Sequence, residues 1–341
     1  MTALATLSPV VQDLTVFDTT LQLGESEPLG VGVKRVTMEQ LELAARGFFD
    51  PETPFGPAVH ESRKCVKRVR AMLRLIEGEL PEKVYHFENQ RLRDTARLIA
   101  EVRSAQGVVN AATSIRGLYA DLLADSTFDE MIVRLERRRD FIELKTLEDP
   151  NLVDRVVRGL EKAYNRYSSW PTDSDAREVY GLGIRDSYQA IEPGLTATYQ
   201  TGRHAMVRAY RRRGPRDFHN WRKRVKDLRH QMEFLAPLWP EVVVGTAMTL
   251  DRLGDILGDD NDLAESVSLL GRRHDLCPNP RERSLFRALV AQHRSELHIA
   301  SEILGRRVYA EKPASLSMRY SEYWESRQMA LGQSLDTIVV Y

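Results

Sequence analysis

The sequence is poor in the features that mark secreted or membrane-spanning proteins. Only two cysteines, Cys65 and Cys277, occur in 341 residues, and their spacing indicates neither a disulfide framework nor a zinc site. No apolar run of about 18 residues is present, and the first 30 residues lack the basic start and apolar stretch of a signal peptide. We therefore expect a cytoplasmic protein without membrane contact.

An excess of charge of either sign is also missing. The 49 basic and 49 acidic residues cancel, so the whole molecule has no general attraction for nucleic acids or membranes. The charges are nevertheless segregated, because Arg203 to Glu233 holds eleven Lys or Arg and three acids, whereas Asp251 to Glu265 holds six acids and one Arg. A charged binding site therefore has to come from this local distribution.

Catalytic and cofactor signatures are absent as well. The sequence contains no P-loop, no H-E-x-x-H pair and no Ser-His-Asp signature. The acidic run D-D-N-D at 259–262 could hold a divalent ion, but we interpret it as a helix end and turn. The sequence thus favours a protein that is not an enzyme and that has no cofactor and no metal site.

Strand alternation is hard to find, and helical spacing dominates from Val33 onward. This spacing predicts an all-α protein, with a flexible lead-in over residues 1–30 and a C-terminal helix and tail over residues 313–341. The predicted helices of the intervening body lie near 36–48, 57–78, 82–105, 107–124, 127–147, 151–168, 173–192, 194–213, 216–236, 239–260, 262–272 and 279–309.

One basic segment occurs twice. The stretches H-E-S-R-K-C-V-K-R-V-R at 60–70 and H-N-W-R-K-R-V-K-D-L-R at 219–229 share a histidine and four basic residues at the same offsets. Such a repeat predicts two helical halves, about 31–170 and about 173–312. We expect them to form two antiparallel bundles related by a pseudo-two-fold axis around a shared central groove or pore.

Each copy has a basic face and an apolar face when it is placed on an α-helix. The basic faces consist of His60, Arg63, Lys64, Lys67 and Arg74, with Arg70 at the margin, and of His219, Arg222, Lys223, Lys226 and Arg229. The apolar faces consist of Val59, Val66, Val69, Met72, Leu73 and Ile76, and of Phe218, Trp221, Val225, Leu228, Met232 and Leu235. We expect the apolar faces to lie in the core.

The basic faces need a counter-charge, because like charges at i,i+4 spacing destabilise a helix by a few tenths of a kcal/mol per pair. An internal source is the acidic helix D-R-L-G-D-I-L-G-D-D-N-D at 251–262, and the other source is an external polyanion. The matching helix of the first half, at 91–104, carries four arginines. We therefore favour an external anion and keep internal neutralisation as the alternative.

Other residues are candidates for the same site. Arg35 and Arg203 lie in the helices before the two basic segments, and Tyr199 lies close to Arg203. A histidine flanked by Arg and Lys loses its proton more readily, so His60 and His219 can stay neutral and donate an N–H to a phosphate oxygen. That role is one of binding and needs no acid–base chemistry.

With both copies in view, the sequence resembles the CHAD family, helical domains named for conserved histidines. The resemblance covers about residues 30–312 and is strongest in F-H-N-W-R-K-R-V-K-D-L-R-H-Q-M-E-F-L at 218–235. It departs from the family pattern at 102–104, where V-R-S stands in place of L-R-D. The resemblance implies two helical bundles with pseudo-two-fold symmetry and a basic groove or pore that binds inorganic polyphosphate.

The resemblance assigns the ligand to His60, Arg63, Lys64 and Lys67 of the first copy and to His219, Arg222, Lys223 and Lys226 of the second. Sulfate or phosphate ions are expected to fit the same site, and polyphosphate granules are a possible location in the cell. Nucleic acid is a less suitable ligand, because no aromatic platform lies among the basic residues. The alternatives that stay open are a metal-dependent polyphosphate or triphosphate phosphohydrolase and a nucleic-acid-binding or scaffold protein.

Overall fold

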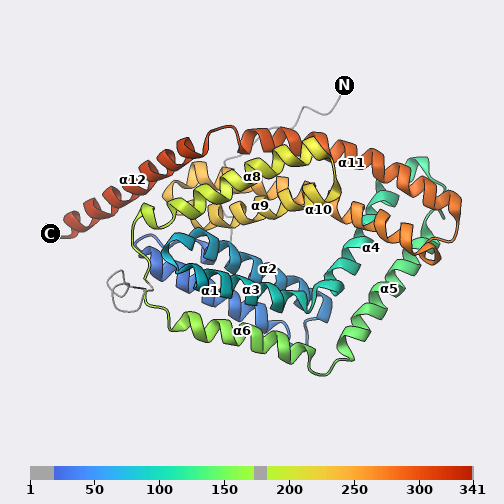
Figure 1. Cartoon of the computed structure of the whole chain (residues 1–341), viewed down its shortest axis with the longest axis horizontal. Coiled ribbons are helices and arrows are strands. Elements are labelled where there is room, and N and C mark those ends of the chain that lie inside the picture. The colour runs from blue at the N-terminus through green and yellow to red at the C-terminus, as the bar shows by residue number, and fades with distance from the viewer. Residues whose placement is uncertain (1–18, 173–182, 340–341) are drawn as a thin grey trace.

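The computed structural model describes residues 19–172 and 183–339, and the described chain is all-α (Figure 1). No strand occurs in these two ranges, and no described helix is long and apolar enough to cross a membrane. The helices are α1 (Leu29–Arg46), α2 (Phe55–Leu75), α3 (Glu82–Arg97), α4 (Ala100–Leu118), α5 (Asp129–Leu147), α6 (Leu152–Ser168), α8 (Glu192–Arg212), α9 (Pro215–Phe234), α10 (Pro240–Arg272), α11 (Pro280–Val308) and α12 (Pro313–Val339). The fold class predicted from the sequence is confirmed.

Proline fixes the start of several helices. Pro215, Pro240, Pro280 and Pro313 each occupy the first position of a helix, where the missing N–H costs nothing and the fixed φ suits helical backbone. Asn279 adds a side-chain cap to α11 by accepting hydrogen bonds from the next two backbone N–H groups.

Two predicted helix boundaries are wrong. The break between α3 and α4 falls at residues 98–99 rather than after residue 105, and α10 continues without interruption through 259–262. The acidic run is therefore not a helix end and turn. Asp260 in this run is buried and accepts hydrogen bonds from Arg294 and His298 of α11, so a neighbouring helix satisfies this carboxylate.

Another predicted helix, 173–192, falls partly outside the described residues. From residue 183 onward the structure has a short 3-10 turn, Tyr188–Ala190, before α8 begins.

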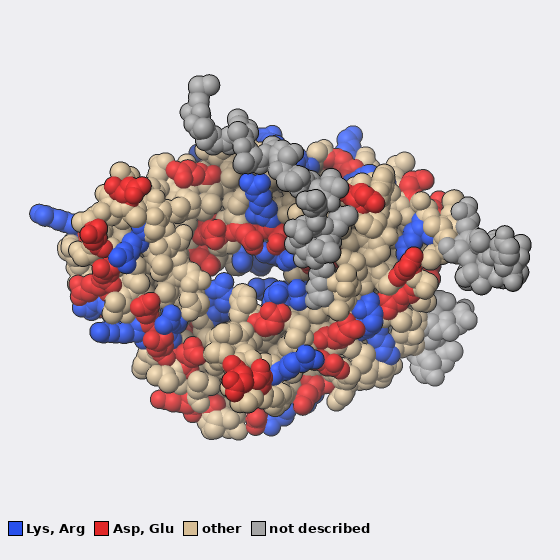
Figure 2. Space-filling view, turned by 180° about the vertical axis from the view of Figure 1, so that it is seen from behind, with Lys and Arg blue, Asp and Glu red and all other residues tan. Residues whose placement is uncertain are grey.

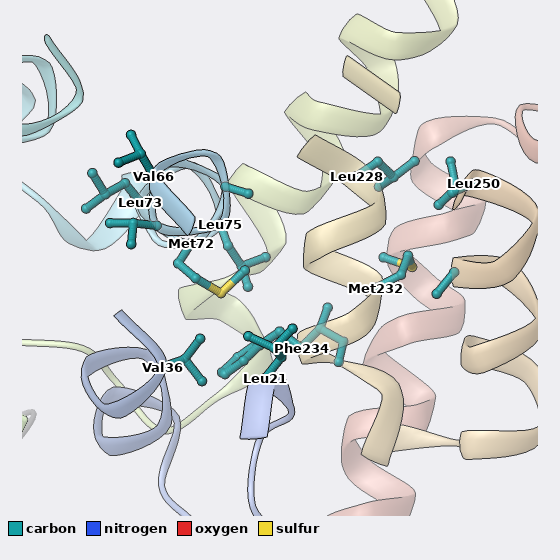
Figure 3. Packing of buried hydrophobic residues seen from close by; sticks show 14 of the residues in the cluster. Leu21, Val36, Val66, Met72, Leu73, Leu75, Leu228, Met232, Phe234 and Leu250 are labelled. Atoms are coloured by element: carbon teal, nitrogen blue, oxygen red, sulfur yellow. The ribbon is translucent and has the colours of Figure 1, made fainter. Parts of the chain in front are cut away.

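The apolar faces of the two basic segments lie in one large hydrophobic cluster, as predicted. All twelve of the predicted core residues on α2 and α9 are buried. Figure 3 shows Met72 on the side of α2 that faces Val36 of α1, and Leu228 of α9 near Leu250 of α10. Burial of one face fixes which way each helix is rotated, so the basic faces of α2 and α9 point away from this cluster.

A second, smaller hydrophobic cluster is built by α4, α5, α10 and α11. Each of these four helices also contributes to the first cluster. α4 contributes Ala105 to the first cluster and Val108 to the second, and α10 contributes Leu257 to the first and Leu263 to the second. Helices from both halves of the sequence contribute to each cluster, so the two predicted halves share their cores.

The segment before α1 is packed, although the sequence placed it in a poorly ordered lead-in. The Leu23 side chain is buried, and its backbone N–H donates a hydrogen bond to the carbonyl of Phe234 at 3.0 Å. Arg327 of α12 donates hydrogen bonds to the carbonyls of Gly24 and Glu25 at 2.7 and 2.6 Å. The two ends of the described chain are thereby fastened to each other.

Candidate functional site: a basic cluster between four helices

α2 and α9 meet in their C-terminal halves. Arg74 Nη1 donates a hydrogen bond to Asp227 Oδ1 at 3.2 Å, and both side chains are buried. One turn further along α9, Gln231 Nε2 donates to the carbonyl oxygen of Ala71 at 3.3 Å. These contacts fix the relative position of the two helices and bring their basic faces toward a common space.

Basic side chains from three helices gather in that space. The basic cluster consists of His60, Arg63 and Lys67 of α2, Arg103 of α4, and His219, Arg222 and Lys226 of α9. Burial, together with the positive charges of Arg222, Arg63, Arg103 and Lys226, lowers the pKa of Lys67 to about 7. Side chains from both copies of the repeated motif therefore lie in one cluster.

The basic cluster remains open to water. Lys67 is surrounded by protein atoms, yet its side chain is accessible to solvent, as expected for a group inside an open hollow rather than in a sealed core. Figure 2 shows such a hollow near the middle of one face, with Lys and Arg side chains around it and Asp and Glu side chains beside them. Water in the hollow reduces the cost of the Lys67 charge.

The two histidines of the motif have similar surroundings. Burial and the charge of Arg103 lower the pKa of His60, and burial and the charge of Lys223 lower the pKa of His219. Both imidazoles are therefore neutral near pH 7. His219 Nδ1 is buried without a hydrogen-bond partner among the described residues.

The arginines of the cluster are incompletely satisfied. Arg63 Nη1 donates a hydrogen bond to the carbonyl oxygen of Ala96 at 2.5 Å, but its Nε has no partner in the described part of the chain. Arg222 Nε is buried and unpartnered in the same way. Burial lowers the pKa of both guanidinium groups. Keeping them charged therefore costs desolvation free energy, which a bound anion would offset.

Two glycines of α10 allow α9 to come close. A Cβ at Gly254 would lie 2.7 Å from Lys226 Cε, and a Cβ at Gly258 would lie 3.2 Å from Arg222 Nη2. The two glycines are four residues apart, as are Arg222 and Lys226. The bare backbone of α10 thus forms one wall against which these two long side chains lie.

Acids of α10 neutralise part of the second basic face. Lys226 Nζ lies 3.4 Å from Asp251 Oδ1 and 3.0 Å from Asp255 Oδ1, and Arg229 Nε lies 3.0 Å from Asp251 Oδ1. Arg229 also pairs with Glu233. Internal neutralisation, which the sequence left as the alternative, therefore accounts for part of this copy, because the position of α9 along α10 places the acids within reach.

The first basic face has no comparable acid row. Lys67 makes no ion pair with any residue in the described ranges, and Lys64, which is half-exposed, lies 3.4 Å from Glu61 Oε2. The two copies of the motif therefore differ in charge balance, with most of the free positive charge on α2 and α4.

A second set of cations flanks the cluster, and we name it the flanking cations. It consists of Arg70, Arg93, Arg216, Lys223 and Arg224. Burial and Arg74 lower the pKa of Arg70 to about 10, and Arg70 Nε donates a hydrogen bond to Asn89 Oδ1 at 2.7 Å. Asp227 accepts from Arg74 and lies 3.2 Å from Arg224 Nη2, so it offsets part of this charge.

The structure does not bring Arg35, Tyr199 or Arg203 to the basic cluster. Arg35 pairs with Glu27 at 2.8 Å and donates to the carbonyl oxygens of residues 20 and 22, so it anchors the segment before α1. Tyr199 is buried and donates to the carbonyl oxygen of Glu311 at 3.0 Å, and Arg203 lies beside it. Arg35 and Tyr199 therefore stabilise contacts between distant parts of the chain.

Arg103 belongs to the cluster although the sequence did not select it. Its charge acts on His60, Arg63, Lys67 and Arg222 at once. The available signal was the V-R-S segment, in which the arginine occupies the middle position of the family's L-R-D pattern. Next to it, Ser104 Oγ donates a hydrogen bond to Glu265 of α10, so Ser104 joins two helices and caps neither.

The acids near the cluster do not form a metal site in the described ranges, where no group of three or more His, Cys, Asp or Glu side chains could hold an ion. Burial and the charges of Asp262 and Asp255 raise the pKa of Asp259. This shift reflects first the burial of Asp259 and then repulsion between neighbouring carboxylates.

Comparison with known protein families agrees with this geometry. The model of the CHAD domain matches residues 42–271, which include both copies of the basic motif, Arg103 and the acid row of α10. No curated protein matches the sequence. Because the matched segment covers more than half of the chain, this protein belongs to the CHAD domain family.

Proposed function

We propose that this protein binds inorganic polyphosphate in the hollow between α2, α4, α9 and α10, without catalysing a reaction. The observation that carries the proposal is the convergence of Lys67, Arg103 and Arg222 from three helices on one water-accessible space. Folding brings these like charges together against their mutual repulsion. A polyanion offers them charge-assisted hydrogen bonds that water cannot match in strength.

A linear polyanion suits the site better than a single ion. The positive charge extends from the basic cluster to the flanking cations, and several phosphates in one chain can contact both sets together. Each phosphate that pairs with Lys or Arg releases counterions, so we expect the affinity to fall steeply with salt. A sulfate or phosphate ion would occupy only part of this surface.

The side chains have different roles in the proposed complex. Arg63, Arg103 and Arg222 donate paired N–H groups to phosphate oxygens, and Lys67 takes up a proton as the anion arrives. His60 and His219 each donate one N–H while neutral. Lys64 and Lys223 lie at the rim of the hollow. Lys226 binds the ligand after its ion pairs with Asp251 and Asp255 of α10 break.

The arrangement proposed from the repeat remains part of this hypothesis. α2 and α9 would be equivalent helices of two halves, about 31–170 and about 173–312, related by a pseudo-two-fold axis through the groove. Residues 313–341 would then be an addition to the duplicated unit. We expect the protein in the cytoplasm, with polyphosphate granules as one place to look for it.

The direct test is titration of the protein with long-chain polyphosphate across a series of salt concentrations. The variant Lys64→Glu/Lys67→Glu/Lys223→Glu/Lys226→Glu should lose binding, whereas charge reversal of Lys162 on α6 and Arg287 on α11, which are exposed, should have little effect. Unchanged affinity in the fourfold variant would show that the hollow is not the binding site. RNA of equal charge should not displace polyphosphate.

A phosphohydrolase remains the second candidate, favoured only by the acids that lie beside the basic cluster. Burial and the neighbouring acids Asp262 and Asp255 raise the pKa of Asp259, as the carboxylates gather on one side of α10. Release of phosphate from polyphosphate with magnesium, lost in Asp259→Asn and Asp262→Asn, would establish this activity. If the wild-type protein releases no phosphate, binding without catalysis is the function that stands.

A further inference from the structure

The outer face of α8 carries positive charge that the basic cluster does not use. His204, Arg208, Arg211 and Arg212 are exposed on this face, and none of them makes an ion pair with a described residue. Arg208 and Arg212 are four residues apart, a spacing at which like charges destabilise a helix slightly. The last turn of α8 therefore presents an unneutralised basic surface.

Two adjoining cavities lie along this face. One, of about 390 Å³, lies between α8 and α9 and is lined by Arg208, Lys223, Arg224 and Asp217 among others. The other, of about 460 Å³, is lined by Arg208, Arg211 and Arg212. His204 and Arg208 line both cavities, so the two form one continuous groove with more cations than acids.

This groove is continuous with the basic cluster through α9. The charge of Lys223 lowers the pKa of His219, and Lys67 acts on the same imidazole. Lys223 in turn lies close to Arg224, Arg216 and Arg70, whose charges lower its pKa after burial, and to Asp227, whose charge raises it. Positive charge therefore extends from Lys67 across α9 to Lys223, which lines the groove, and Asp227 is the acid beside it.

We propose that the groove between α8 and α9 is a second binding site for a phosphate chain, taking the part of a polyphosphate that extends beyond the hollow. This inference rests on the proposed function. From residue 204 to residue 212 the helix rises about 12 Å, which gives room for several consecutive phosphates. Arg208 and Arg212 would hold them by charge-assisted hydrogen bonds, with Lys223 as the link to the hollow.

A chain is a better ligand for this groove than a free ion. Exposed cations in water hold a single phosphate weakly, because the solvent screens each pair. Once one end of a polyphosphate is held in the hollow, its next phosphates are at a high effective concentration beside α8. The groove would therefore add affinity for long chains and little for short ones.

The test compares long-chain with short-chain polyphosphate in the full-length protein. Arg208→Glu/Arg212→Glu should weaken long-chain binding by about tenfold or more while short-chain binding changes by less than about threefold. Lys162→Glu/Arg287→Glu has the same change of net charge on distant exposed helices and should leave both affinities unchanged. The dependence of long-chain affinity on salt should become shallower only in the α8 variant.

The outcomes separate this inference from the proposed function. If the wild-type protein binds neither chain length, the proposed function fails and the second site fails with it. If long-chain affinity is equal in the wild type and in Arg208→Glu/Arg212→Glu, the hollow is the whole site and the inference alone is wrong. If Arg208→Glu/Arg212→Glu lowers the affinity for an RNA oligonucleotide and leaves the affinity for polyphosphate unchanged, the groove is a nucleic-acid site and the inference is wrong.

Discussion

Arg74 of α2 donates a hydrogen bond to Asp227 of α9 at 3.2 Å, across 153 positions of sequence. Both side chains are buried, and Arg74 also donates to the carbonyl oxygen of Arg70 at 3.0 Å. This pair lies where the two helices that carry the repeated motif meet. It therefore determines how far apart their basic faces stand.

Replacing Asp227 by alanine should destabilise the protein strongly, because it leaves Arg74 buried without a counter-charge. We expect a loss of about 3–5 kcal/mol in the free energy of unfolding, measured by urea denaturation. Asp154→Ala removes an exposed partner of Arg158 and should cost at most about 1 kcal/mol. Equal losses of stability in the two variants would show that Asp227 does not hold α2 and α9 together through Arg74.

Lys67→Gln should reduce polyphosphate affinity by about tenfold or more, since it removes a charged donor from the centre of the cluster. The slope of log affinity against log salt should become shallower by about one. Folding should be unharmed or improved, because the substitution removes repulsion from Arg63, Arg103 and Arg222. Lys312→Gln, which removes an exposed charge near the start of α12, is the matched control for titration and for urea denaturation.

Polyphosphate binding should take up protons above pH 7 and weaken as the pH rises. Lys67 has its pKa lowered to about 7 in the empty protein, and a bound anion favours its charged form. Calorimetric titration in two buffers of different ionisation enthalpy measures the proton uptake. Lys67→Gln should abolish most of it, and a wild-type uptake equal to that of the variant would contradict this assignment.

The same shift predicts how the empty protein responds to pH. Between about 7 and the ordinary lysine value of 10.5, the unfolded chain holds a proton on this residue that the folded protein lacks. The contribution of Lys67 to the free energy of unfolding therefore increases with pH across this window. Urea denaturation of wild type and Lys67→Gln at several pH values isolates that contribution, and parallel curves would show that it is absent.

Asp255→Asn should strengthen polyphosphate binding, because it releases Lys226 from an exposed carboxylate 3.0 Å away. Surface ion pairs are weak, so the gain should be less than tenfold. Glu302→Gln, which breaks an exposed pair with Arg306 on α11, should not change the affinity. Weaker binding in Asp255→Asn would mean that the acid holds Lys226 in its binding position.

Arg213→Gly should raise the free energy of unfolding by about 1 kcal/mol. Arg213 ends α8 in the left-handed region, with φ of 54°, where a side chain costs about 1–2 kcal/mol and glycine is favoured. Thermal or urea denaturation measures the change. A loss of stability would show that the Arg213 side chain contributes contacts that outweigh its backbone strain.

The sequence was sufficient to predict the helices and their buried faces, and the reason is physical. Val66, Met72, Leu228 and Met232 recur at helical spacing, and only one rotation of each helix buries them together. The same rotation places the basic residues on the opposite side. Periodicity therefore predicted both the core and which side chains of α2 and α9 could face a shared space.

Periodicity could not predict contacts that depend on how one helix is placed along another. The pairing of Lys226 with Asp251 and Asp255 follows from the close approach at Gly254. Two glycines four residues apart were a visible sign of that approach, but the sequence does not say which helix they face. The prediction that Arg35 belongs to the binding site was wrong for a related reason. Its hydrogen-bond acceptors are backbone carbonyls of residues 20 and 22, which lie in the irregular segment before α1 and follow no periodic pattern.

The hydrogen bonds from Arg327 of α12 to Gly24 and Glu25 show that the folded unit and the family-matched segment differ in length. The segment that carries the family signature ends at residue 271, yet Tyr320 and Trp324 are buried in the main hydrophobic cluster, as are Leu23 and Leu29. A chain shortened to the signature would expose those contacts and leave α9 and α10 without part of their packing. The cooperative folding unit of this protein is therefore longer at both ends than the segment by which the family is recognised.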